Sequence, residues 1–182
     1  MRILRWLGIL VAVIVVGIGA VFVAARFHDG PLGMIAGGPL VRGELVTGPE
    51  PDWSFVHDVD TVEFQLLSPA RSRTTWILQV DGKVYIPCGY MTSAVGRLWK
   101  QWPIEAEKDG RAILRVGDKK YERQLVRIQS GYLLEPLTQQ ISRKYHVPAT
   151  PEAVTSGSLW LFELAPRASA GDGLTSVHQN GA

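Results

Sequence analysis

Basic and aromatic side chains lie at both ends of one apolar segment, Thr74–Tyr90. Arg71 and Arg73 precede this segment, Thr75 lies at its start, and Arg97 and Lys100 follow it. Guanidinium forks, ammonium groups and the amides at strand and helix starts are what phosphate recognition requires. Two nearby tryptophans, Trp99 and Trp102, offer flat surfaces for stacking an aromatic ring. The pattern predicts a binding site for an anionic ligand.

The distribution of charge leaves a second interpretation open. The formal net charge is only +2, but residues 27–69 carry one basic and seven acidic side chains, a net of −6. Residues 70–127 carry twelve basic and six acidic side chains, a net of +6. The arginines could therefore pair with the acidic segment, with the tryptophans in the core, or they could form a basic patch for a ligand. Nucleic acid is excluded as a partner, because the domain as a whole is not basic and shows no recognised binding motif.

Catalytic and metal-binding signatures are absent from the sequence. It contains no P-loop, HExxH, GxSxG or paired-cysteine zinc pattern, and its four histidines are scattered. Cys88 is the only cysteine, so an intramolecular disulfide is excluded, and a β-strand position is expected for this residue. The sequence predicts no metal site and identifies no catalytic residue.

The N-terminal segment is uncharged from Trp6 to Ala25, with Arg5 and Arg26 on its flanks. About 20 apolar residues are enough to cross a bilayer as a helix. Arg2 and Arg5 precede the segment, so the positive-inside rule predicts a single-pass inner (cytoplasmic) membrane protein with the N-terminus inside and the domain on the outer, periplasmic side. A cleaved signal peptide, with Val23 and Ala25 at the small-residue positions, is the alternative.

The remaining chain divides by composition into three parts. Residues 27–51 are rich in glycine and proline and predict a linker, with one short strand over Leu40–Thr47. Residues 168–182 predict a disordered tail. Between them, residues 52–167 alternate strands with turns, including a hairpin at Asp81-Gly82 and another at Gly117-Asp118.

About six strands and one late helix at Pro136–Tyr145 are expected in this domain. A short helical connector, Ser93–Trp102, is expected to stop near Pro103. The fold class that follows is mainly β: a split, six-stranded antiparallel β-barrel with short helices, preceded by one N-terminal transmembrane helix.

The chain from about Leu40 to Arg167 resembles the split β-barrel flavoproteins, the pyridoxamine-phosphate-oxidase-like and deazaflavin-dependent nitroreductase-like group. The resemblance lies in Asp52-Trp53-Ser54-Phe55, the unit ending Gly82-Lys83-Val84-Tyr85-Ile86-Pro87, the connector Arg97–Pro103, the segment Arg115–Arg123, and the closing Lys144-Tyr145 and Trp160–Arg167. It implies a six-stranded barrel, often a homodimer, that holds FMN or a deazaflavin by its phosphate.

Carried over by position, the resemblance makes Arg73 and Thr75 phosphate-side residues, with Arg97 and Lys100 as a second basic contact. Arg71 and Trp102 complete the predicted cofactor-binding set. Two hypotheses follow. The chain is a membrane-anchored flavin-dependent oxidoreductase, in which the flavin performs the hydride transfer. Alternatively, it is a non-catalytic barrel that binds a lipid headgroup, haem or an envelope protein.

Overall fold

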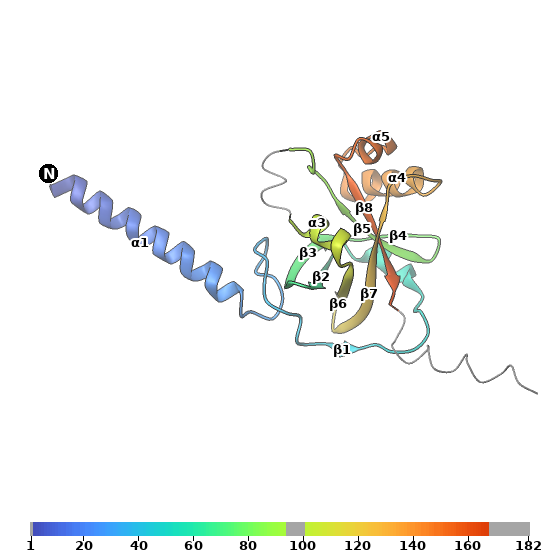
Figure 1. Cartoon of the computed structure of the whole chain (residues 1–182), viewed down its shortest axis with the longest axis horizontal. Helices are drawn as coiled ribbons and strands as arrows, with labels where there is room; N and C mark the ends of the chain where they lie inside the picture. Colours follow the sequence, from blue (N-terminus) through green and yellow to red (C-terminus); the bar gives the residue numbers. More distant parts are fainter. Residues whose placement is uncertain (1, 94–100, 168–182) are drawn as a thin grey trace, which may run out of the picture.

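The computed structural model describes residues 2–93 and 101–167, and it shows one curled sheet that forms a half-barrel, with a long N-terminal helix that extends away from it (Figure 1). The sheet has eight strands: seven run in the order β3-β2-β6-β7-β8-β5-β4, and β1 pairs with β7 in parallel. All other pairings are antiparallel. The mainly β class, the short helices and the N-terminal apolar helix are as the sequence predicts.

The strands are β1 (Glu44–Leu45), β2 (Thr61–Leu67), β3 (Ala70–Trp76), β4 (Leu78–Val80), β5 (Lys83–Cys88), β6 (Arg111–Val116), β7 (Lys119–Ile128) and β8 (Trp160–Pro166). The helices are α1 (Arg2–Ala25), the 3-10 helix η1 (Trp53–Asp58), α3 (Trp102–Lys108), α4 (Leu134–Tyr145) and α5 (Pro151–Thr155). Helix α1 is long and apolar enough to cross a membrane.

The hairpin at Asp81-Gly82 forms as predicted, with positive φ angles of 51° and 73° that suit a tight two-residue turn. The strand before it is interrupted, however. Trp76 ends β3, which pairs with β2, and Leu78 begins β4, which pairs with β5. This division gives the domain seven strands instead of six, and the eighth, β1, lies within the short strand expected over Leu40–Thr47. Strand β5 lies inside the sheet, between β8 and β4, whereas β4 is at one end of the sheet.

Two apolar clusters explain why both faces of this hairpin are apolar. One lies inside the half-barrel and includes Phe64, Ile86 and Leu114; the other lies beneath α4 and includes Leu78 and Tyr85. Consecutive residues of β4 and β5 thus contribute to different cores. Strand β7 changes partner along its length: it pairs with β6 from Lys119 to Gln124 and with β8 from Arg123 to Ile128, without a break in either register.

Pro103 begins a helix instead of ending one. It lies in the first turn of α3, where a proline needs no amide partner, so the expectation that a helical connector stops there is wrong at this end. The remainder of the expected connector, residues 94–100, lies outside the described residues, as does the predicted tail, 168–182.

The glycine- and proline-rich segment, residues 27–51, lies along the barrel. Gly37 donates a backbone hydrogen bond to Ser72 on the outer edge of β3, at 3.0 Å, and the Ser72 hydroxyl donates to Gly38 O at 2.6 Å. A Cβ at Gly37 would lie 1.8 Å from Gly30 O, so only glycine permits this close approach. The other end of the sheet is covered by α4: Ile77 N donates to the Tyr145 hydroxyl and Gln79 N to Gln140 Oε1.

Candidate functional site

The two arginines of β3 project into the half-barrel. Arg73 lies opposite Phe64 and Arg71 opposite Leu66 in the β2–β3 ladder, and directly opposed residues share a face of a sheet. Phe64 and Leu66 are fully buried in the inner core. Alternation puts Thr75 on the same face. The inward-facing positions of a barrel strand usually carry apolar side chains. In β3 two of these positions carry arginine instead.

The arginines line a cavity of about 500 Å³ between β3, β5, α3 and the end of α1. Its walls are formed by Phe22, Arg26, Met34, Ile35, Ala36, Pro69, Arg71, Arg73, Thr74, Thr75, Pro87, Cys88, Gln101, Trp102 and Glu105. A volume of this size is within the range of small-molecule sites. Because β3 does not hydrogen-bond to β5, the cavity occupies the open side of the half-barrel.

Positive charge in this cavity exceeds negative charge. Among the described residues of its wall, Arg26, Arg71 and Arg73 face a single carboxylate, Glu105. Arg73 Nη2 lies 3.7 Å from Glu105 Oε2, an ion pair too long for a hydrogen bond, which leaves Oε2 without a hydrogen-bond donor within the described chain. Arg71 Nη2 donates a long hydrogen bond to Ala36 O, at 3.5 Å. Arg71 Nε is buried and has no hydrogen-bond partner among the described residues.

Burial and neighbouring positive charge both lower the pKa values of the two guanidiniums. Burial lowers the pKa of Arg73, and repulsion from Arg71 adds to this effect, while Glu105 opposes it. Burial also lowers the pKa of Arg71, helped by repulsion from Arg26. Both side chains stay protonated at any physiological pH. An anion in the cavity would therefore relieve an existing electrostatic cost.

Four of the six residues selected from the sequence, Arg71, Arg73, Thr75 and Trp102, line this one cavity. The other two, Arg97 and Lys100, lie outside the described residues, and so does Trp99. Trp102 is buried, with its ring centroid 4.8 Å from that of Phe64 in an edge contact. The indole of Trp102 is therefore mainly part of the core, and a ligand ring could stack on only a small part of it.

Sequence reasoning did not select Glu105 or Arg26 for this site. Arg26 was recognised only as the flank of the apolar segment, and nothing in the sequence links it to β3, which follows more than forty residues later. Glu105 lies in the first turn of α3, a helix that the sequence analysis had ended at Pro103. Correct placement of that proline at a helix start would have brought Glu105 into consideration.

Comparisons with known proteins add a fold similarity and no activity. No protein-family model matches the chain, and no curated protein matches it. Among solved structures, the chain is similar to the conserved hypothetical protein Rv2991 from Mycobacterium tuberculosis, with 15% identity and a TM-score of 0.47. The match covers 70% of this chain and 85% of the other.

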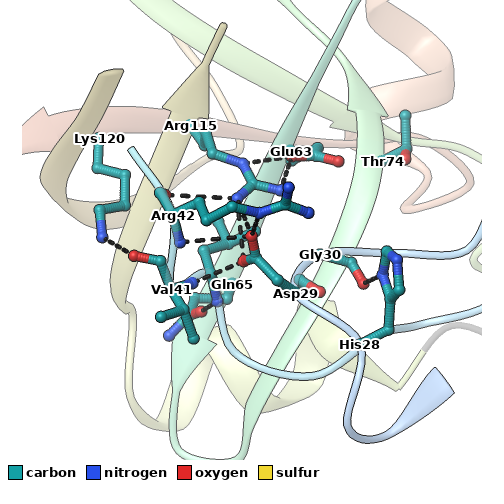
Figure 2. A network of polar contacts seen from close by, with 12 residues as sticks. His28, Asp29, Gly30, Val41, Arg42, Glu63, Gln65, Thr74, Arg115 and Lys120 are labelled. Atoms are coloured by element: carbon teal, nitrogen blue, oxygen red, sulfur yellow. Dashed lines mark hydrogen bonds and ion pairs between the residues drawn. The ribbon is translucent and has the colours of Figure 1, made fainter. Parts of the chain in front are cut away.

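A second hollow, of about 290 Å³, contains charges that neutralise one another (Figure 2). Arg115 pairs with Asp29 at 3.0 Å and with Glu63 at 2.5 Å, and Arg42 Nε donates to Asp29 Oδ2 at 2.6 Å. Two guanidiniums thus meet two carboxylates, and a third carboxylate, Asp118, also lines the hollow, so its described wall carries no excess of positive charge. It connects the segment after α1 to β2 and β6.

Both interpretations of the charge distribution therefore apply, at different places. Arg115 and Arg123 pair with carboxylates of the acidic segment, Asp29, Glu63 and Glu50. Among the described residues, Arg71 and Arg73 form no ion pair with a carboxylate of that segment, and the carboxylate beside Arg73 comes from α3. No group of three or more metal-binding side chains occurs in the part of the chain that the structure describes. The chemistry that the cavity offers is anion binding.

Proposed function

We propose that this chain is a membrane-anchored split-barrel protein that binds a phosphate-bearing ligand in the arginine cavity. The observation that carries the proposal is the pair of interior-facing guanidiniums, Arg71 and Arg73, in a cavity of about 500 Å³ whose described wall has a single carboxylate, Glu105, beside Arg73. Interior charges without partners are costly, and a phosphate is the anion that two adjacent guanidinium forks fit best.

FMN or a deazaflavin is the first ligand to test, because the sequence resembles the split-barrel flavoproteins. The residues present are compatible with it, because Arg71, Arg73 and Thr75 line the cavity and would hold the phosphate. Ile35, Pro87 and the exposed part of Trp102 would bound the ring system. The bound flavin would supply hydride-transfer chemistry, and the protein would orient it and exclude water.

The proposed arrangement places the N-terminus in the cytoplasm, α1 across the inner membrane and the barrel on the periplasmic side. The support is the charge bias around the apolar helix: Arg2 and Arg5 precede it, and Asp29 follows soon after Arg26. Fusion of a reporter that functions only outside the cytoplasm to the C-terminus tests this orientation. An inactive fusion, with activity from the cytoplasmic reporter, would reverse it.

The binding proposal is tested with the full chain in a mild detergent. Absorbance of the purified protein, and calorimetric titration with FMN and with a deazaflavin phosphate, measure occupancy and affinity. We expect Arg73→Ala to weaken phosphate-ligand binding by about 10- to 150-fold, because a hydrogen bond to a charged group contributes about 1.5–3 kcal/mol.

Arg143→Ala is the matched control. Arg143 is exposed in the last turn of α4, outside the cavity, so its loss should leave binding unchanged. Equal effects of the two substitutions would remove the phosphate assignment. A colourless protein that takes up neither flavin would eliminate the oxidoreductase function and leave a non-catalytic barrel, for which a lipid headgroup is the ligand discussed below.

A further inference from the structure

Several apolar side chains are exposed around the end of α1, beside the cavity. Phe27 is 86% exposed and Met34 is 91% exposed. Met34 lies at the tip of a tight turn that is closed by two backbone hydrogen bonds between Leu32 and Ile35, at 3.0 Å and 2.9 Å. Met34 and Ile35 also form part of the cavity wall. The wall toward α1 therefore combines apolar side chains with Arg26, and the wall toward β3 is basic.

This turn has a defined position relative to the barrel. Asp29, just after α1, accepts hydrogen bonds from Val41 N and Arg42 Nε and pairs with Arg115 of β6 (Figure 2). Gly38 N donates to His28 O at 3.0 Å, and Gly37 pairs with Ser72 on β3. The exposed turn and the end of α1 are thus connected to the same sheet that carries the arginines.

The position of α1 relates the cavity to the bilayer. Phe22 and Arg26 both line the cavity, and they are one helical turn apart, about 6 Å along the axis. With α1 across the membrane, Arg26 lies at the level of the headgroups and Phe22 at the edge of the hydrocarbon. The mouth of the cavity then opens at the membrane surface, and its apolar side faces the acyl chains.

We propose that the ligand of the arginine cavity is the headgroup phosphate of an anionic membrane lipid, which enters from the bilayer with its chains against Phe22, Met34 and Phe27. The inference rests on the proposed phosphate-binding function and names the source of the phosphate. One molecule of this kind would satisfy both halves of the site: its phosphate would pair with Arg71 and Arg73, and its chains would pack on the apolar side chains at the membrane surface.

The experiment compares three probes on the full chain in a neutral maltoside detergent, by calorimetric titration. These are dioctanoyl phosphatidylglycerol, dioctanoyl phosphatidylcholine and glycerol 3-phosphate, which supplies phosphate without chains. We expect phosphatidylglycerol to bind at least about tenfold more tightly than either of the others, because only it offers both the net negative charge and the apolar chains.

Two variants separate the contributions. Arg73→Ala should weaken both phosphatidylglycerol and glycerol 3-phosphate. Met34→Gln should reduce only the preference for phosphatidylglycerol over glycerol 3-phosphate, by about three- to tenfold, since Met34 is exposed and its replacement does not disturb the core. Tyr132→Gln, an exposed aromatic outside the cavity, is the matched control and should change neither affinity.

The outcomes distinguish this inference from the proposal beneath it. If glycerol 3-phosphate or FMN binds as tightly as phosphatidylglycerol, the site takes a soluble phosphate, and the lipid inference is overturned while phosphate binding stands. Equal binding of phosphatidylcholine would also overturn it, because the arginines would then select nothing. If no phosphate-bearing probe binds, both proposals fall.

Discussion

Replacement of Glu105 by glutamine should strengthen phosphate binding. Glu105 is the single carboxylate among the described residues of the cavity wall, and it lies 3.7 Å from Arg73 Nη2. In the empty site it acts as an internal anion, and a bound phosphate must compete with it for Arg73. The substitution Glu105→Gln keeps the shape of the side chain and removes the competing charge.

The size of the effect follows from the separation and the exposure. At 3.7 Å, two unit charges attract by about 4.5 kcal/mol at an effective dielectric constant of about 20, and by about 1 kcal/mol in water. The side chains are 21% and 30% exposed, and the pair lacks a hydrogen bond, so the lower part of this range applies. We expect a gain of about 1–2 kcal/mol, or about five- to thirtyfold in affinity for FMN or glycerol 3-phosphate.

Calorimetric titration of the variant and the wild-type chain measures this gain. Thermal unfolding without ligand should show the opposite sign, a loss of up to about 1 kcal/mol, because Arg73 then has no counter-ion in the empty cavity. The matched control is Glu107→Gln, a residue of the same helix that pairs with Arg127 and does not line the cavity. If Glu105→Gln binds phosphate no better than wild type, Arg73 does not contact the ligand and the electrostatic reasoning is refuted.

Two further predictions concern the contacts that hold the structure around the site. Burial alone would raise the pKa of Asp29, but hydrogen bonds from Arg42 and Val41 and the charge of Arg115 hold this pKa well below its usual range. The ionised carboxylate therefore contributes its full stabilisation above about pH 4, and this contribution declines as the pH falls. Asp29→Asn should therefore lower the free energy of unfolding by about 1–3 kcal/mol at pH 7, with a difference from wild type that shrinks in acid, measured by urea denaturation. An unchanged difference at pH 3 would contradict the ionic origin. Burial raises the pKa of Tyr145 to about 12, so the neutral phenol stabilises the fold below about pH 10 and this contribution is lost as the pH rises toward 12. Tyr145→Phe removes the hydrogen bonds to Ile77 and Asp60 and should lower the free energy of unfolding by about 1–2 kcal/mol at pH 7. Between pH 10 and pH 12 the variant should lose less stability than the wild type. A parallel loss in both proteins would show that other groups govern alkaline unfolding.

Local signals in the sequence predicted the local parts of the fold. Asp81-Gly82 and Gly117-Asp118 form the turns of two hairpins, β4–β5 and β6–β7, as predicted. The helix expected at Pro136–Tyr145 begins two residues earlier and ends where predicted. These features depend on turn chemistry and periodicity within about ten residues.

Features that depend on distant residues were not predictable in the same way. The role of Asp29 depends on Arg115, 86 positions later, and composition alone makes its segment look like a linker. The end of β3 at Trp76 is likewise tertiary, because this side chain stacks on Tyr145 at 4.3 Å while the next residue enters the inner core. That Arg71 and Arg73 face inward follows from the β2–β3 register, which no pattern in their own segment specifies.

The covered edges of the sheet affect how copies of this chain behave in a membrane. Anchored proteins move in two dimensions, and their domains meet at high effective concentration. An open strand edge at a fixed height above the bilayer would pair readily with the same edge of a neighbour. The Gln140 side chain accepts a hydrogen bond from Gln79 N within β4, and the Tyr145 hydroxyl accepts one from Ile77 N just before it. At the other edge, Gly37 N donates to the carbonyl oxygen of Ser72 in β3. With the chain anchored as proposed, these contacts would oppose edge-to-edge pairing of neighbouring copies at both ends of the sheet.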